Sequence, residues 1–334
     1  MNCPVCGSAT FEGAIPAHEI QEEIRYRERF VRAKLGRRPS RAEAKDLTDF
    51  MHGFAAPLHA CAGCGLLVRA ERRIRDAGSY REDPNDPEIM RQLLPRYVKA
   101  FRNKAPGFRE LIGDHADVLE VGSHLGAFLQ VAEEWNWTAI GLDVGADTSS
   151  FARASGFTVR REMVEDTRLA ARSFDAVFVW NCFEQLAEPA STLDAIYGLL
   201  RPGGLAVVRV PNARFYFEMR SHDGAALAWN NLLGFPYLYG YQEEHVNRIA
   251  NDHGFEFVRG FDSELITMPF PDLNEKARES QCANSRKVGR WSIRTTNRAG
   301  ALTGPWIEMT YRKLERPAPL REGALDGRFL ARAA

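Results

Sequence analysis

Short apolar runs alternate with amphipathic stretches through the middle of the chain. The runs are rich in branched and aromatic side chains and predict strands at 117–121, 138–143, 157–160, 175–180 and 205–210. The stretches between them carry apolar residues at helical spacing and predict helices at 126–136, 147–156 and 191–200. Strands this apolar, separated by helices, are typical of a parallel sheet covered on both faces. The pattern predicts an α/β fold from residue 117 onward, continued by a helix at 245–253 and strands at 255–263 and 306–311.

The first 70 residues follow a different pattern and predict a separate module. They contain two pairs of cysteines, each with two residues between them and a glycine after the second cysteine. Between the pairs lies an arginine-rich insertion, in which Ser40 and Glu43 have the spacing of a helix capping box. We interpret the charges of this insertion as a solvated helix face. The predicted division is a module at 1–70, a linker with a leading helix at 71–116, the α/β domain at 117–315 and a tail at 316–334.

Composition and charge narrow the classes of partner. Of the 334 residues, 45% are hydrophobic and 26% are charged, which is ordinary for a globular protein. The formal net charge is zero and offers no electrostatic footprint for tight binding to nucleic acid or membranes. No apolar run approaches the roughly 18 residues that a membrane span needs, and the N-terminus lacks the pattern of a signal peptide. We therefore expect a cytoplasmic protein without a membrane partner.

The densest candidate chemistry lies at 118–126, where a glycine-bearing turn follows a predicted strand and opens a predicted helix. Glycine lets the backbone approach a ligand closely. Asp143 ends the next predicted strand, about 20 residues further along the chain. In dinucleotide-binding folds an acid at this place accepts hydrogen bonds from ribose hydroxyls. The segment therefore predicts a site for a nucleoside-containing cofactor.

Several separate motifs in this region resemble those of class I S-adenosylmethionine (SAM) dependent methyltransferases. The first is Glu120-Val-Gly-Ser-His-Leu-Gly126, which is followed by the acid Asp143. The others are Ser173–Asn181, Phe183-Glu-Gln-Leu-Ala-Glu-Pro189, Leu199-Leu-Arg-Pro-Gly-Gly204 and Val210-Pro-Asn212. The resemblance covers residues 117–315. It implies a Rossmann-like, doubly wound seven-stranded sheet and a SAM-dependent methyltransferase.

Carried over position by position, the resemblance also implies a set of cofactor-binding residues. Asp143 is expected to hold the ribose hydroxyls and Glu120 to lie near the methionine amino group of SAM. Val144 and the loop after the third strand are expected to border adenine. The full set is Glu120, Gly122, Ser123, Gly126, Asp143, Val144, Val164, Glu165 and Asn181.

Two positions depart from the family pattern. His124 stands where the family has a glycine, and the loop is expected to work if this residue has a φ below zero. Gln185 stands where the family has a histidine, and an amide cannot act as a base. The candidate catalytic residues are therefore Glu184 and His245, the latter because the unperturbed pKa of histidine is roughly 6.5.

The segment 213–245 is expected to cover the acceptor, as the corresponding segments do in this methyltransferase class. It contains Tyr237, Tyr239 and Tyr241, whose rings can stack on an acceptor and whose hydroxyls can form hydrogen bonds with it. We expect a small-molecule acceptor from sugar, polysaccharide or secondary-metabolite biosynthesis. The alternatives are an rRNA-type methyltransferase, to which the arginine-rich insertion points, and a SAM-binding protein without catalysis.

The paired cysteines Cys3, Cys6, Cys61 and Cys64 can supply the four thiolates of a structural zinc site. Without a secretion signal, such pairs indicate a metal before a disulfide. The module resembles the N-terminal zinc-binding domain of sugar C-methyltransferases, where the second pair is also followed by Gly-Leu, here Gly65-Leu66. The large extra C-terminal domain of those enzymes is not expected here. Free thiols or a redox pair remain as alternatives to zinc.

Overall fold

The computed structural model of the chain describes residues 2–20, 56–69, 87–102, 104–215, 237–263, 302, 304 and 306–315. A seven-stranded sheet forms its centre, in the order β10-β11-β8-β7-β4-β5-β6. The strands are β4 (Asp117–Val121), β5 (Thr138–Leu142), β6 (Val159–Arg160), β7 (Phe174–Trp180), β8 (Leu200–Pro211), β10 (Phe255–Ser263) and β11 (Trp306–Lys313). β4 to β8 pair in parallel, whereas β11 runs antiparallel to both β8 and β10. The predicted Rossmann-like α/β fold is confirmed.

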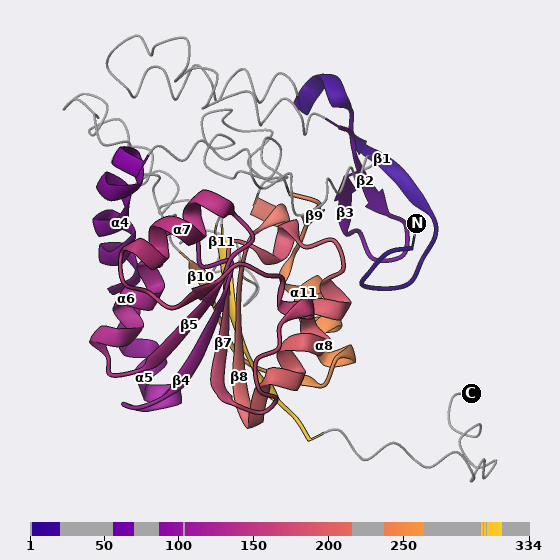
Figure 1. Ribbon diagram of the computed structural model, residues 1–334. Helices are drawn as coiled ribbons and strands as arrows, with labels where there is room; N and C mark the ends of the chain where they lie inside the picture. Colours follow the sequence, from indigo (N-terminus) through magenta and orange to yellow (C-terminus); the bar gives the residue numbers. More distant parts are fainter. Residues whose placement is uncertain are drawn as a thin grey trace.

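Helices cover both faces of the sheet (Figure 1). One face carries α4 (Pro87–Arg102), α5 (Ala105–Ile112) and α6 (Ala127–Glu134), and the other carries α8 (Pro189–Leu199) and α11 (Glu243–Asp252). α7 (Ala146–Ala154) connects β5 to β6. Successive residues of β7 belong to opposite cores, with Val177 on one face and Phe178 on the other. This two-sided burial explains why the strand is continuously apolar.

Some local predictions differ from the structure. The turn at 201–204 was expected to precede a strand at 205, but β8 already begins at Leu200 and runs through the turn with a register shift. The helix predicted at 147–156 is α7, which begins at Ala146 after the N-cap residue Gly145 and ends at Ala154. α5 was not predicted. Its eight residues form a short helix beside α4, too short for a clear periodic signal.

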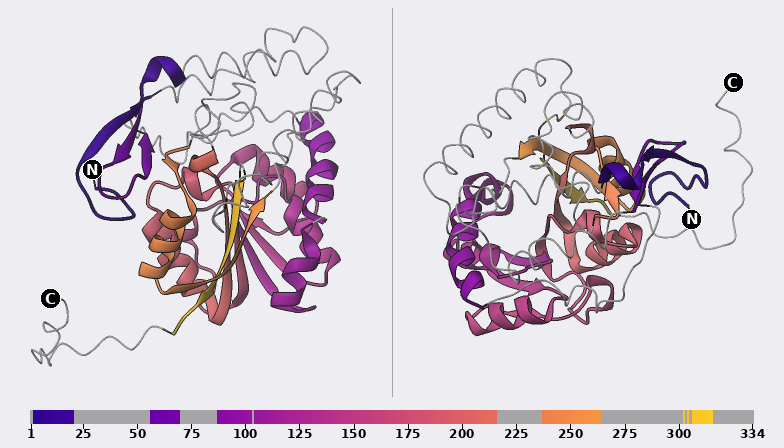
Figure 2. Two further views of the ribbon diagram at one scale, coloured as in Figure 1. Left: turned by 180° about the vertical axis from the view of Figure 1, so that it is seen from behind. Right: turned by 90° about the horizontal axis from the view of Figure 1, so that it is seen from above.

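The N-terminal module contains a second, antiparallel sheet with the order β1-β2-β3-β9. β1 (Phe11–Ile15), β2 (Leu58–Cys61) and β3 (Leu67–Arg69) come from the module, but β9 (Tyr239–Gly240) comes from the predicted methyltransferase domain. Apolar residues of the module, such as Leu66 and Val68, belong to the same buried cluster as Val246 of α11. Figures 1 and 2 show the module against the α11 side of the central sheet.

Several expectations fall on residues that the structure does not describe. They are the arginine-rich insertion with Ser40 and Glu43, part of the linker before residue 87, and the tail from residue 316. Among the helices that the structure does describe, none has the length and apolar character of a membrane span.

Candidate active site

The loop between β4 and α6 depends on glycine at two positions. Gly122 and Gly126 have positive φ angles of 76° and 81°. A Cβ atom at Gly126 would lie 2.4 Å from Cδ2 of Phe157, and one at Gly122 would lie 2.9 Å from Sγ of Cys182. The backbone N–H groups of Gly122 and Ser123 donate to the carbonyl of Leu142 at 2.8 and 3.0 Å. The loop is thus folded back onto the end of β5.

His124 does not have the negative φ on which the loop was expected to depend, because its φ is 47°. It therefore adopts the left-handed conformation that a glycine would occupy in the family motif, at a cost for an L residue of about 1–2 kcal/mol. Its backbone N–H donates to Oδ2 of Asp143 at 2.7 Å, which helps to hold this conformation. Its imidazole ring meets the ring of Tyr97 on α4 edge to face, with centroids 6.1 Å apart.

Asp143 lies just beyond the carboxyl end of β5. Besides His124, the N–H of Gly145 and the hydroxyl of Thr148 donate to its carboxylate, at 2.8 and 2.7 Å. An ionised carboxylate offers about four lone-pair sites, so three protein donors leave capacity for a further one. Val144 follows directly, and its carbonyl accepts a hydrogen bond from Nε of Arg161 at 3.2 Å. This is the placement that the sequence predicts for a ribose-binding acid.

Two buried polar groups beside the loop have unmet hydrogen-bonding capacity. Oε2 of Glu120, on β4, and Oγ of Ser123 are buried and have no hydrogen-bond partner. Burial, and secondarily the charge of Asp143, raises the pKa of the Glu120 carboxyl well above its ordinary value. Buried polar atoms are nearly always hydrogen-bonded in folded proteins. Such atoms beside a glycine cradle suit a bound molecule that carries polar groups, as SAM does.

The remaining predicted cofactor residues border the same region, although some already bond to protein groups. Val164 and Glu165 belong to the 3-10 helix η2 (Val164–Asp166), and the Glu165 carboxylate accepts a hydrogen bond from Thr192 of α8. Asn181 follows β7 with a φ of 53°, and its side-chain oxygen accepts from Arg209.

Four predicted site carboxylates lie within electrostatic range of one thiol, that of Cys182. Burial raises the pKa of Cys182 well above its ordinary value, and the charges of Glu184, Asp143, Glu165 and Glu120 raise it further. These residues come from four different segments of the chain, which the fold brings to the carboxyl edge of the parallel strands. Sequence spacing alone could not place Glu184 and Glu165 near Asp143.

Glu184 lies in the 3-10 helix η3 (Phe183–Gln185) and is completely buried. Neither of its carboxylate oxygens forms a hydrogen bond. Burial raises the pKa of this carboxyl to about 8, although its own backbone N–H, the positive charge of Arg209 and the side chain of Gln185 oppose the shift. The neighbouring Gln185 donates its amide to the carbonyl of Asn181 at 2.8 Å. A carboxyl group that titrates near neutral pH can accept or donate a proton.

His245 does not have the free ring nitrogen that the predicted catalytic role requires. Its Nδ1 accepts the N–H of Gln242 at 3.0 Å, in a capping box at the start of α11. The other nitrogen, Nε2, must then carry the proton, and it donates to the carbonyl of Cys64 at 2.8 Å. Burial lowers the pKa of the ring. These contacts are those of a capping and bridging residue, so we do not retain His245 as a candidate base.

The three predicted acceptor-binding tyrosines are core residues. Tyr237, Tyr239 and Tyr241 are 3%, 1% and 0% exposed. The hydroxyl of Tyr239 donates to the carbonyl of Ala187 at 2.9 Å, and the ring of Tyr241 packs 5.4 Å from that of Phe183. The described structure therefore buries all three tyrosines in or next to β9, in place of the predicted open stacking surface. Residues 216–236 of the predicted acceptor-covering segment lie outside the described residues.

Arg209 on β8 is a buried residue at this edge that sequence reasoning missed. It is 0% exposed, bonds Asn181 and lies 4.4 Å from the ring centroid of Trp306. Burial lowers the pKa of its guanidinium to about 10, against the opposing charges of Glu308 and Glu184. The available signal was a single charged residue inside the otherwise apolar run 205–210.

The four N-terminal cysteines lie together as a tetrahedral ligand set requires. Their sulfur atoms are all within 4.8 Å of one another, with Cys3 to Cys64 at 3.6 Å and Cys6 to Cys61 at 3.4 Å. Zinc–sulfur bonds of about 2.3 Å in a tetrahedron imply sulfur–sulfur distances of about 3.8 Å. Each turn contains an equivalent backbone hydrogen bond. The N–H of Gly7 donates to the carbonyl of Cys3 in the first turn, and the N–H of Gly65 donates to that of Cys61 in the second. The described cysteines are free thiols, so the group fits a metal.

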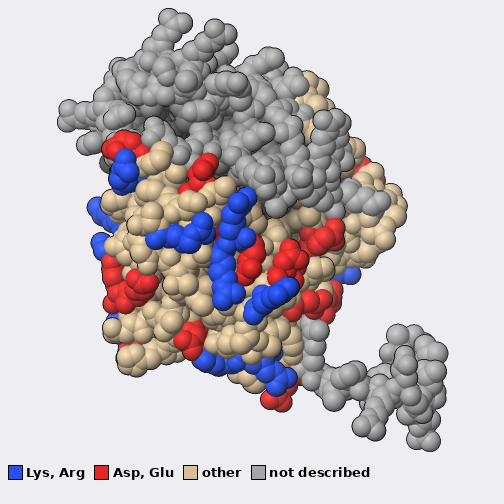
Figure 3. Space-filling view, viewed as in Figure 1, with Lys and Arg blue, Asp and Glu red and all other residues tan. Residues whose placement is uncertain are grey.

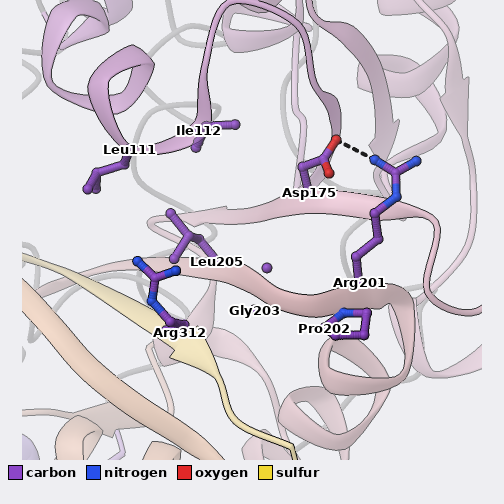
Figure 4. Close-up of a pocket in the computed structure, with 9 residues that line it drawn as sticks. Leu111, Ile112, Asp175, Arg201, Pro202, Gly203, Leu205 and Arg312 are labelled. Atoms are coloured by element: carbon purple, nitrogen blue, oxygen red, sulfur yellow. Dashed lines mark hydrogen bonds and ion pairs between the residues drawn. The ribbon is translucent and has the colours of Figure 1, made fainter.

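An open cavity of about 210 Å³ lies at the opposite end of the sheet (Figure 4). Asp175 and Arg201, near the starts of β7 and β8, form part of its lining, and Arg312 reaches it from β11. The guanidinium of Arg201 bridges Asp117 and Asp175. Because the cofactor loop and Glu184 lie at the other ends of these strands, this cavity does not belong to the candidate active site.

Comparison with known proteins identifies the class to which this fold and site belong. A family model described as a methyltransferase domain matches residues 85–259, more than half of the 334 residues. The chain belongs to this family of methyltransferase domains. No curated protein sequence matches the chain significantly.

Solved structures agree on the fold. Phosphoethanolamine N-methyltransferase 2 of Haemonchus contortus, solved with SAM, has a TM-score of 0.50 and 13% identity, covering 75% of this chain and 62% of its own. A chain from the complex between the Haloferax volcanii Trm112 methyltransferase activator and the putative methyltransferase has a TM-score of 0.47 and 14% identity. That match covers 70% of this chain and 94% of the other. At these identities the likeness concerns the fold alone.

Proposed function

We propose that this enzyme transfers the methyl group of SAM to a small-molecule acceptor, with the cofactor in the 120–126 loop and the acceptor near Glu184. The observation that carries the proposal is the set of buried polar atoms without partners. Those of Glu120, Ser123 and Glu184 lie in segments at the same edge of the sheet. Asp143 and Glu184 are close enough to one thiol, that of Cys182, for both to raise its pKa.

SAM supplies an electrophilic methyl group on its sulfonium sulfur. In our proposal, Asp143 accepts hydrogen bonds from the ribose hydroxyls, while Glu120 and Ser123 orient the methionine end. In its ionised form, Glu184 accepts the proton of an acceptor hydroxyl or amine, and its raised pKa of about 8 makes it a stronger base than an exposed glutamate. Holding the two reactants in line supplies most of the acceleration, and one base typically adds about 10²–10⁴-fold.

We further propose that residues 1–70 form a zinc module held by Cys3, Cys6, Cys61 and Cys64. The sulfur distances and the two matching glycine turns support this ligand set. Four protein ligands leave no open coordination position, which favours a structural role over a catalytic one. The resemblance of the module to that of sugar C-methyltransferases supports a sugar, polysaccharide precursor or secondary metabolite as the acceptor.

An rRNA-type methyltransferase is the main alternative. On the face that Figure 3 shows, Lys and Arg are interspersed with Asp and Glu among the described residues. Proteins that bind the phosphate backbone of nucleic acids independently of sequence typically have a continuous basic surface. This charge distribution supports the small-molecule proposal.

Incubation with labelled SAM and separated cell fractions tests the proposal. The full chain should label a low-molecular-weight metabolite, which mass spectrometry then identifies, and Asp143→Ala should abolish most of the label. Label in the RNA fraction, with salt-dependent RNA binding, would support the rRNA alternative. SAM binding without label in any fraction would support a non-catalytic role.

A further inference from the structure

The N-terminal module is joined by backbone hydrogen bonds to the chain segment 237–242. β9 within this segment is the fourth strand of the module's own sheet, with Leu67 opposite Gly240 and Val68 opposite Tyr239. Arg69 extends the connection, because its backbone N–H donates to Leu238 at 3.0 Å and its Nε donates to Tyr237 at 2.9 Å. Arg69 is 1% exposed, so these bonds are shielded from water.

The same segment is bonded to the candidate active site on its other side. The N–H of Leu238 donates to the backbone carbonyl of Glu184 at 2.9 Å. The hydroxyl of Tyr239 donates to Ala187, three residues beyond Glu184. The ring of Tyr241 packs against Phe183, which precedes Glu184. The segment 237–242 therefore lies between the module and η3, and it contacts both.

A third contact ties the cysteine cluster itself to the end of this segment. His245 donates from Nε2 to the carbonyl of Cys64, and its Nδ1 accepts the N–H of Gln242. The imidazole thus spans two backbone groups, one on a cluster cysteine and one at the start of α11. Without a metal, the two turns would be joined by weaker contacts, such as the hydrogen bond from Ala62 to Thr10 and the contacts between the thiols.

We propose that the metal in the cysteine cluster positions the 237–242 segment, and through it Glu184, so that the module acts on acceptor binding and leaves SAM binding unchanged. His245 is a positioning residue in this scheme, since it acts through the Cys64 carbonyl. This inference rests on the proposed function for its consequence in catalysis. Its structural part, the coupling of metal to segment, stands on the contacts alone.

Hydrogen–deuterium exchange on the full chain tests the coupling directly. Wild type is compared with and without prior metal removal by a chelator, with metal content measured on the same samples. Metal loss should speed exchange in peptides covering 237–242 by on the order of tenfold or more, because local opening becomes easier. Peptides covering β4 and β7 should keep their protection, and calorimetry should show unchanged SAM affinity.

The variant His245→Gln separates coupling from metal binding. This variant should retain its metal, yet its peptides covering 237–242 should exchange faster than those of wild type. In the matched control His253→Gln, the exchange rate of these peptides should not change. His253 caps the other end of α11, where its Nδ1 bonds Asp194 rather than the module. If metal-free wild type does not stay folded, the comparison of these two metal-loaded variants decides the question.

Two results would overturn the proposal. One is unchanged exchange at 237–242 after metal loss or in His245→Gln. The other is an equal rise in the exchange rate of peptides covering β4 and β7, which would mean that the metal stabilises the whole fold. Once an acceptor is known, metal removal should raise the KM for the acceptor and leave the KM for SAM unchanged. Failure of wild type to bind SAM would instead contradict the proposed function, independently of the exchange result.

Discussion

His124 donates its backbone N–H to the carboxylate of Asp143, 2.7 Å away, and does so from a left-handed conformation. The bond connects the cofactor loop after β4 with the acid after β5. It orients one carboxylate oxygen of Asp143, while Gly145 and Thr148 orient the other. Three protein donors thus orient the carboxylate of Asp143 in the predicted cofactor site.

Replacement of Asp143 should weaken SAM binding. Asp143→Ala removes the acceptor for the ribose hydroxyls and leaves protein donors without their partner, so we expect a loss of about 1–3 kcal/mol. Calorimetry measures the loss as an affinity about 5- to 150-fold lower. Asp147→Ala is the matched control, because Asp147 is exposed on the first turn of α7. Equal SAM affinity in wild type and Asp143→Ala would remove Asp143 from the site.

The conformation of His124 should have a measurable cost. His124→Gly relieves the positive φ, whereas His124→Ala removes the imidazole and keeps the strain. We therefore expect the glycine variant to be the more stable of the two by about 1 kcal/mol. Thermal unfolding of both variants gives the comparison, in which the lost ring contact with Tyr97 cancels. An alanine variant as stable as the glycine variant would mean that the loop relaxes to a negative φ.

The cysteine cluster should hold one zinc ion per chain. Protein purified without chelator should contain close to one equivalent, and a Cys→Ser change at position 3, 6, 61 or 64 should lower the content because one thiolate ligand is lost. Cys182→Ser should keep the metal, since Cys182 lies beside the cofactor loop. Full metal retention in each of the four ligand variants would contradict the assignment.

Glu184 should make stability fall as pH rises. Burial raises its pKa to about 8 in the folded chain, while the unfolded value is about 4.3. Between these values the folded state holds a proton that the unfolded state has released, so the free energy of unfolding decreases with pH. Glu184→Gln lacks this titration and should gain stability relative to wild type from pH 5 to pH 8, by roughly 1–4 kcal/mol at full effect.

Thermal unfolding across pH 5 to 8 in the absence of SAM measures this difference. Glu133→Gln, a change of an exposed carboxylate on α6, should show the same pH dependence as wild type. A stability difference between wild type and Glu184→Gln that stays constant with pH would show that Glu184 is not protonated in the folded chain.

Glu184 should also contribute to turnover. With an identified acceptor, Glu184→Gln should lower kcat by up to the roughly 10²–10⁴-fold typical of a general base. His245→Ala should affect the KM for the acceptor more than kcat, since its ring nitrogens are bonded to Gln242 and Cys64. Wild-type turnover by Glu184→Gln between pH 6 and 9 would exclude Glu184 as the base.

The sequence by itself determined the central sheet and the order of its elements. Strands in the middle of the sheet are buried on both faces and are therefore mostly apolar, and β4 accordingly begins and ends at the predicted residues 117–121. The edge strand β10 also has its predicted bounds, 255–263, although Phe257 and Phe261 are exposed. The cysteine pairs and the glycines of the 120–126 loop could also be recognised from the sequence. Each is a local requirement, set by metal chemistry or by backbone conformation at a single turn.

Tertiary structure alone decided which predicted site residues are available for the roles that the sequence suggests. Tyr239 and Tyr241 have the composition of an acceptor-binding surface, yet they are buried because β9 joins the sheet of a module some 170 residues away in sequence. His245 has the chemistry of a base, but Cys64 and Gln242 occupy its ring nitrogens. His124 stands where the family has a glycine and has a positive φ, which its bond to Asp143 helps to maintain. In each case, the role of the residue depends on a contact between segments that are distant in sequence. The neighbouring residues in the sequence do not predict that contact.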